Sequence, residues 1–492
     1  MFVQHVETEI RFDGMDNFRN GFADAIYYNN APSGDPMDAA PVWGYDFNTA
    51  YIQDDFQVTD NVSIVLGLRY DWYESSDVPA ENADFVADYG FSNAMNIDGM
   101  DLLQPRFGIS IDVSDQTVIR GGIGIYSGGN PNVWLSNNFA ATNVLQFGDR
   151  GRNYGYTDGS RSLFDADVVY GLVESTAPAG AGAGWGVPSE MVAAVASGTG
   201  DNFEINFLDP NFELPSELKM AVGLTHVFQN DWVFNADILI TQGDDDAMIL
   251  HGDLIQTGVD ADGYPQYSSP LEDSFGLTNS NVSGKSRSWS LGVNKSWENW
   301  EFTAGYAHSD SEDVQPMTSS VAFSNYQNRA FFDPQEDVAS RSNYDIEHRV
   351  TFTTTWRKDF FNRFPTVMSL YGSANSGRPY SISYNGTASP YGFTPFLDFR
   401  DNVLLPTEQR NGHESSWWTK LDLRIDVGIP VFRDDDRASV FLIVDNLTNL
   451  LNDSWGILKQ HNFPRTVTEG TAEPRIGDAS RYEIRFGIKY AF

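Results

Sequence analysis

Cysteine is absent from the 492-residue sequence, which excludes disulfide bridges, thiolate metal sites and cysteine nucleophiles. Long apolar runs are also missing. A membrane-spanning helix needs about 20 mostly apolar residues, whereas the longest runs, such as SVFLIV at 439–444, are far shorter. The mean hydropathy of −0.36 does not decide between a soluble protein and a membrane barrel, because only alternate residues of a barrel strand face lipid.

Basic residues are scarce, with 31 Lys and Arg against 68 Asp and Glu and a net charge of −37 at pH 7. Such a protein repels phosphate backbones, so nucleic acid is excluded as a partner. Residues 1–12, MFVQHVETEIRF, lack the basic start, apolar centre and cleavage site of a secretory signal. We therefore expect a protein that is not exported or a sequence whose beginning is missing.

Motifs for enzyme chemistry are also lacking. The seven histidines show no HExxH spacing, and no GxSxG nucleophile elbow is present. Paired carboxylates are uninformative in so acidic a chain. We predict that the protein is not an enzyme, has no cofactor and has no metal site. An outer-membrane hydrolase remains a distant alternative.

What the sequence does contain is strict alternation of apolar and polar residues, clearest in the C-terminal segment RYEIRFGIKYAF at 481–492. Successive side chains of a strand point to opposite faces, so one face of this segment is entirely apolar. The run is about twice as long as the mean strand of 5–6 residues. We interpret it as a membrane-crossing strand with a lipid-facing stripe formed by Tyr482, Ile484, Phe486, Ile488, Tyr490 and Phe492.

The same alternation recurs along the chain, for example in VSIVLGLRYDW at 62–72. Counting these runs predicts about 14 strands. They lie near 2–13, 49–58, 62–72, 105–113, 117–126, 216–228, 232–241, 287–297, 300–309, 346–358, 366–375, 417–430, 437–446 and 481–492.

The links between these runs alternate between short and long. Short links include TDN at 59–61 and EN at 298–299, whereas long links range from 73–104 to 127–215. All short turns therefore belong on one edge and all long loops on the other, which is typical of bacterial outer-membrane barrels with periplasmic turns and extracellular loops. We predict an all-β, transmembrane antiparallel β-barrel in the bacterial outer membrane, with lipid around it and the last strand ending in the periplasm.

Several segments spread over most of the chain resemble one known family. They include YIQDDFQVTDNVSIVLGLRYDWY at 51–73, PRFGISIDVSDQTVIRGGIGIYSG at 105–128, SNYDIEHRV at 342–350, SGRPYSISYNG at 376–386 and, most characteristically, FLIVDNLTNLLNDSWG at 441–456. Together they resemble the Oar-like TonB-dependent receptors of the outer membrane. The resemblance implies a barrel of about 22 strands occluded by an N-terminal plug, and import of an extracellular ligand driven by the inner-membrane TonB complex.

The resemblance also implies that barrel-assembly machinery recognises the terminal aromatic strand, here Phe486, Ile488, Tyr490 and Phe492. The chain departs from the family pattern because we find no signal peptide, TonB box or plug. We therefore interpret residues 1–492 as the C-terminal barrel portion of a receptor, with about eight strands missing upstream. A self-closing porin-like channel and a surface-adhesion barrel are the alternatives.

Charged residues on the polar side of the runs should line the lumen. The candidates are Arg69, Arg106, Arg120, Asp237, Arg349, Asp422, Arg424 and Arg485. They could hold a plug or a solute, but a wetted wall of ion pairs is at least as good an explanation. Acidic clusters at Asp244–Asp246, 260–263 and 96–101 carry carboxylates that suit calcium, yet none completes an EF-hand loop. We expect solvated acidic loops there.

Overall fold

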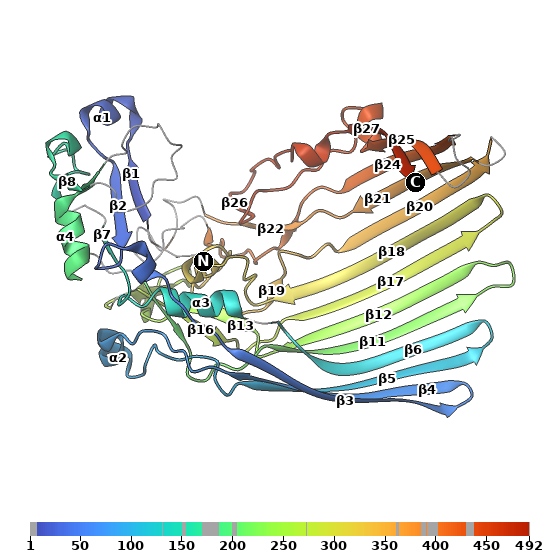
Figure 1. The fold of residues 1–492 in the computed structure, drawn as a ribbon, viewed down its shortest axis with the longest axis horizontal. Helices are drawn as coiled ribbons and strands as arrows, with labels where there is room; N and C mark the ends of the chain where they lie inside the picture. Colours follow the sequence, from blue (N-terminus) through green and yellow to red (C-terminus); the bar gives the residue numbers. More distant parts are fainter. Residues whose placement is uncertain are drawn as a thin grey trace.

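A computed structural model gives the fold of the chain (Figure 1). The residues that it describes are 7–129, 131–149, 154–169, 186–198, 204–271, 273–360, 364–384, 390, 402–429 and 437–491.

One large antiparallel sheet dominates the structure, and its strands neighbour one another in sequence order. Its long strands are β3 (Asp46–Thr59), β4 (Val62–Glu74), β5 (Asp101–Ser114), β6 (Thr117–Ser127), β11 (Ser216–Val227), β12 (Val233–Asp244), β17 (Lys285–Ser296), β18 (Trp300–Asp313), β20 (His348–Asp359), β21 (Pro365–Asn375), β24 (Trp418–Ile429), β25 (Arg437–Asp445) and β27 (Glu483–Ala491). The two-residue strand β19 (Ser340–Arg341) pairs with β18 and brings the sheet to 14 strands. The predicted all-β antiparallel architecture is confirmed.

Every long strand of this sheet was predicted, but the run at 2–13 was wrong. Its described part, β1 (Glu7–Arg11), pairs with β2 (Ala25–Asn30) in a separate three-stranded sheet. Ile10 and Phe12 pack against a small buried cluster instead of facing lipid. Period-two alternation marks any half-buried strand, so the pattern alone could not distinguish the two cases.

This correction changes the parity of the sheet. Its first long strand, β3, starts at the edge that carries the long loops and ends at the edge with the short turns (Figure 1). The inference that about eight strands are missing assumed a start at the turn edge, so that count no longer holds.

The two faces of the sheet differ in chemistry because the register keeps like residues together. On β27, Ile484, Phe486 and Ile488 lie opposite Val444, Leu442 and Val440 of β25. Along β17, Trp289 and Leu291 point to the same face as these apolar side chains, whereas Ser288 and Ser290 point to the other face. One face is thus an apolar band with exposed large side chains, including Phe486 at 72% and Ile488 at 68% exposure. The other face is polar and Gly-, Ser- and Thr-rich.

The long links fold into a layer of their own at the loop edge. It contains helices α1 (Gly14–Asn20), α2 (Ala83–Tyr89), α3 (Asn132–Ala140), α4 (Ser189–Ser197), α5 (Ala322–Gln327) and α6 (Leu447–Leu451). It also contains the short strands β7 (Phe147–Asp149), β8 (Val168–Val169), β9 (Val187–Pro188), β10 (Ile205–Leu208), β13 (Ala247–His251), β14 (Ile255–Val259), β15 (Pro265–Ser268), β16 (Ser274–Asn279), β22 (Pro379–Ile382), β23 (His413–Glu414) and β26 (Thr466–Val467).

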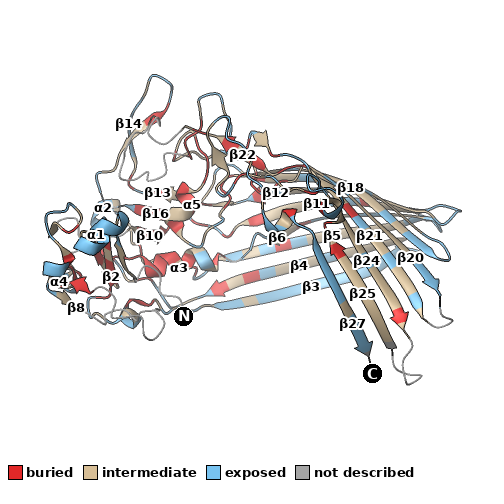
Figure 2. Cartoon of the chain, turned by 90° about the horizontal axis from the view of Figure 1, so that it is seen from above, coloured by how far each residue is buried: buried red, intermediate tan, exposed pale blue. Residues whose placement is uncertain are grey.

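This loop layer holds the main hydrophobic core. Fully buried side chains such as Tyr264, Phe275 and Tyr326 belong to it, and most buried segments in Figure 2 lie there. The long sheet is largely intermediate or exposed, because its two faces meet lipid and a polar interior instead of each other. The loops are therefore a folded structure held at one edge of the sheet.

The sheet is open along its two outer strands. Within the described residues, β3 and β27 end the strand order and do not pair with each other, and Figure 1 shows them at opposite margins of the sheet. Among the helices in the described part of the chain, none is long and apolar enough to cross a membrane.

Candidate functional site

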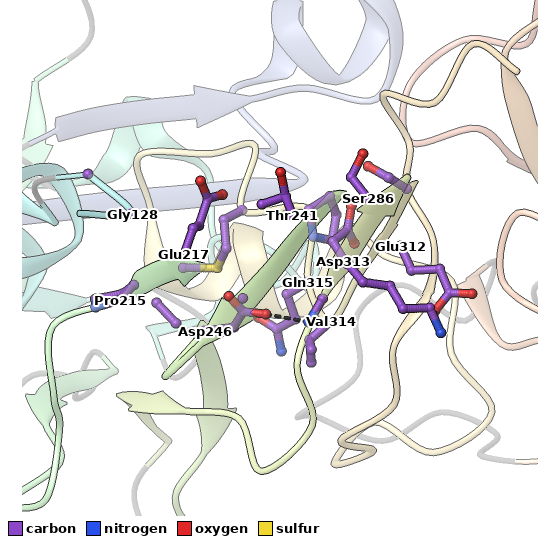
Figure 3. Close-up of a pocket in the computed structure, with 18 of the residues that line it drawn as sticks. Gly128, Pro215, Glu217, Thr241, Asp246, Ser286, Glu312, Asp313, Val314 and Gln315 are labelled. Carbon is purple, nitrogen blue, oxygen red and sulfur yellow. Dashed lines mark hydrogen bonds and ion pairs between the residues drawn. The ribbon is translucent and has the colours of Figure 1, made fainter. Parts of the chain in front are cut away.

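A cavity of about 590 Å³ lies where the polar face of the sheet meets the loop layer (Figure 3). The loop-side ends of four neighbouring strands form its wall, with Glu217 from β11, Thr241 from β12, Ser286 from β17 and Glu312 from β18. The loop segment 314–317 also lines it. The cavity is thus built by residues that lie far apart in sequence and meet through the strand register.

Four carboxylates line this cavity, and three of them have a cationic partner. Glu217 pairs with Lys219 at 2.7 Å, Glu312 with Lys285 at 2.9 Å and Asp313 with Arg410 at 3.0 Å. The fourth, Asp246, has no basic residue within ion-pair distance among the described residues. A cation that entered the cavity would therefore meet the uncompensated negative charge of Asp246.

Asp246 is held in place by backbone contacts. Its Oδ2 accepts a hydrogen bond of 2.5 Å from the Gly284 N–H. The side chain also packs against Gly243, where an added Cβ would lie 2.4 Å from Asp246 Oδ1, so glycine is required for this approach. Burial raises the pKa of Asp246, and the nearby charges of Glu217, Asp313 and Asp244 raise it further. A cationic ligand would relieve this unfavourable environment.

We expect Asp246→Asn to stabilise the loop layer at neutral pH. The carboxyl pKa is higher in the folded state, so the stability that Asp246 contributes is present at low pH and is lost as the pH rises through that raised value. The thermal midpoint of Asp246→Asn should therefore exceed that of wild type by up to a few degrees near neutrality and match it at acidic pH. Scans across this range test the sign, and Asp262→Asn is the control, because Asp262 is an exposed loop carboxylate that does not act on Asp246. A midpoint difference that does not change with pH would contradict the prediction.

The predicted lumen residues lie on the polar face, away from this cavity for the most part. Arg69 donates to Asp71 at 2.8 Å, Gln104 donates to the same carboxylate at 2.6 Å, and Arg106 donates to Gln104 at 3.1 Å. The Arg106 guanidinium lies 4.4 Å from the centroid of the Tyr126 ring. These contacts form one continuous network across β4, β5 and β6.

The other predicted charges also form local pairs. Arg120 lies 4.0 Å from Asp237, Asp422 lies 3.0 Å from Lys420, and Arg424 lies 2.6 Å from Asp426. Arg485 pairs with Asp445 on the neighbouring strand. Arg349 is exposed, and no ion pair to it is found within the described ranges. Seven of the eight predicted charges thus make local contacts with neighbouring side chains, and a binding role for these residues stays a prediction.

The acidic clusters have different roles in the structure. Asp244–Asp246 reaches the cavity through Asp246. In the 260–263 cluster, Asp260 accepts hydrogen bonds from the Asp262 and Tyr264 N–H groups, and near 96–101 the Asp98 carboxylate accepts from the Ser75 N–H. The Asp260 carboxylate thus closes a turn, whereas the Asp98 carboxylate joins its loop to the segment that follows β4.

Sequence reasoning missed most of the cavity. Glu217 and Asp313 were not predicted as site residues, because nothing in the sequence indicates that their strands end beside one another. In the proposed assembly signal, Phe486, Ile488 and Tyr490 are exposed on the apolar face, while Phe492 lies outside the described residues.

Short turns on one edge, folded loops on the other and opposed apolar and polar faces define an outer-membrane β-barrel protein. A family model for the outer membrane beta barrel domain matches residues 8–422. The chain belongs to this family, and its place is the bacterial outer membrane.

Solved structures with a similar fold are far longer than this chain. The outer membrane transporter YddB from Escherichia coli aligns with a TM-score of 0.50 and 12% identity, covering 91% of this chain and 44% of its own. The FrpB iron transporter from Neisseria meningitidis aligns with a TM-score of 0.47 and 10% identity over 94% of this chain and 51% of its own. The siderophore receptor PirA from Acinetobacter baumannii gives a TM-score of 0.44 and 10% identity over 85% and 45%. The chain thus spans about half the length of these proteins. No curated protein matches its sequence.

Proposed function

We propose that this chain is the barrel portion of a TonB-dependent importer that binds its ligand from outside and takes it up with energy from the inner membrane. The observation that carries the proposal is the acidic cavity, which joins the folded loop layer to the polar face of the sheet. The resemblance to Oar-like receptors and the fold shared with the transporter YddB support it. Asp246, whose carboxylate has no cationic partner in the described part of the chain, favours a ligand with a cationic group.

The open edges of the sheet support a larger barrel. An unpaired backbone edge in lipid costs several kcal/mol per group, so we propose that further strands of the same receptor pair with β3 and β27. Because both outer strands run from the loop edge to the turn edge, closure with antiparallel neighbours requires an odd number of added strands. A barrel of about 22 strands would need about nine.

The intact mass of the native protein, purified from outer membranes, tests this closure. We expect a species well above 54.8 kDa that starts upstream of Met1. A species at 54.8 kDa would contradict the larger barrel and favour the self-closing porin-like channel.

Transport itself is tested by comparing which solutes wild-type cells remove from their medium. We expect one solute that wild-type cells remove to stay in the medium of cells lacking this protein and also in the medium of cells lacking the TonB complex. In planar bilayers the purified protein should show no steady open conductance, because an importer opens only when energised. A constant conductance would favour the porin, whereas uptake unaffected by loss of the TonB complex would favour the adhesion barrel.

A further inference from the structure

Two histidines that are 40 positions apart meet at the loop edge of the apolar face. His308 of β18 lies directly opposite His348 of β20 in the strand register. Their ring centroids are 5.2 Å apart. Directly opposed side chains of antiparallel strands have Cβ atoms about 4.5–5.5 Å apart, a separation that lets two imidazoles converge on one ion.

A carboxylate completes a three-membered donor set. His308, His348 and Glu347 each offer one ligand atom, and these atoms all lie within 4.8 Å of one another. His348 Nε2 is 3.4 Å from Glu347 Oε1, close to the separation of about 3.3 Å between two ligands of a tetrahedral zinc ion with bonds of about 2.0–2.1 Å. Small rotations of the His308 ring would bring the third donor into place.

The groups around the three donors orient them. His348 Nδ1 lies 2.8 Å from the Tyr306 hydroxyl, so a proton on Nδ1 leaves the Nε2 lone pair free for a metal. Arg341 donates a hydrogen bond of 3.2 Å to the other carboxylate oxygen of Glu347, Oε2. The Oε1 atom therefore remains directed at His348. Such second-layer hydrogen bonds are the usual support of a metal site.

Two further observations favour a bound cation. His308 Nδ1 is buried and makes no hydrogen bond, which is costly for a polar atom unless it has a partner. The guanidinium of Arg341 also faces three carboxylates, at 2.8 Å from Asp345 and at 3.2 Å from both Glu347 and Glu414. These three carboxylates and one guanidinium leave an excess of two negative charges, which a divalent ion would balance.

We propose that His308, His348 and Glu347 bind a divalent transition metal of the Zn²⁺ class, which clips β18 to β20 at the outer boundary of the apolar band. Two imidazoles and one carboxylate suit Zn²⁺ and leave a fourth position for water. Trp417 stacks on His348 at 5.8 Å and Trp289 lies 5.7 Å from His308, so aromatic rings flank the site. The site is separate from the acidic cavity and does not depend on the proposed transport function.

Zinc titration of the detergent-solubilised native protein, stripped with a chelator, tests the site. We expect one tight Zn²⁺ equivalent in wild type, with affinity reduced about 100-fold or more in His308→Gln and His348→Gln and about 10-fold in Tyr306→Phe. His413→Gln is the matched control, because His413 also pairs with a carboxylate, Glu408, at 2.6 Å but has no third donor in the described structure. The affinity of this control should not change.

Equal zinc affinity in wild type, His308→Gln and His348→Gln would overturn the proposal, as would the absence of tight binding in wild type. If the variants do not assemble, Co²⁺ binding by wild type decides the question. Intense visible absorption bands of tetrahedral Co²⁺ that are removed by added Zn²⁺ would support the site. A weak octahedral spectrum would overturn it.

Discussion

Replacing Leu291 by arginine should destabilise the sheet by about 2–4 kcal/mol, the cost of a basic residue on the lipid face near the middle of a bilayer. Leu291 lies in the centre of β17, opposite Ala236 and Tyr306, and is 42% exposed on the apolar face. Lipid cannot solvate the guanidinium at that depth. Urea unfolding in detergent micelles or vesicles, followed by heat-modifiable gel mobility, measures the loss.

The adjacent residue provides a matched control at the same depth. Ser290 points to the polar face and lies opposite Asp237 in the register, so Ser290→Arg places the same side chain near a carboxylate. We expect a change of less than about 1 kcal/mol, since hydrated positions on the lumen side accept charge. Equal destabilisation by both substitutions would contradict the assignment of the two faces.

Removing the side chain of Arg410 should lower the stability of the loop layer by about 3–5 kcal/mol, the usual cost of removing one partner of a buried ion pair. The side chain is 4% exposed and ion-pairs with Asp313. Its guanidinium donates to the backbone carbonyls of Val314 at 2.9 Å and Ser340 at 3.2 Å, and also to that of Asp313. Burial lowers the pKa of Arg410, which is consistent with strong dependence on these partners.

Arg410→Ala leaves the buried Oδ1 atom of Asp313 without its cationic partner and removes the side-chain hydrogen bonds to three backbone carbonyls. Chymotrypsin cleavage of the loops in intact outer membranes should therefore become faster, while the barrel itself stays assembled. The control is Arg357→Ala, because Arg357 pairs with Glu301 at 3.3 Å with both side chains about half exposed, and such pairs contribute about 0–1 kcal/mol. Unchanged cleavage in Arg410→Ala would show that the loop layer is held by its hydrophobic core alone.

The long strands were predictable because each carries its own pattern. In 62–72 and 481–492, alternation is imposed by the boundary between lipid and a polar interior, and this boundary acts on every second residue. Turn chemistry then sets the short links. The run at 2–13 failed because burying Ile10 and Phe12 in a small core requires the same local alternation as facing lipid.

The candidate sites were much less predictable. Asp246 was noticed only as part of an acidic run, and its cavity depends on Glu217 and Asp313, which come from other strands. His308 and His348 were dismissed because they lack a metal-binding spacing, yet the register of β18 and β20 places them directly opposite each other. Local spacing describes neighbours along the chain, whereas these groups are neighbours across it.

The sequence by itself determined the class of protein, the long strands, their two faces and the alternation of short turns with long loops. These features follow from the period of two along each strand and from turn residues, both of which are local. The tertiary structure alone decided that the loops fold around their own core, that β3 and β27 end the strand order of the described sheet, and which charged and imidazole groups meet. Those outcomes depend on strand register and on packing between distant segments, which no single stretch of sequence encodes.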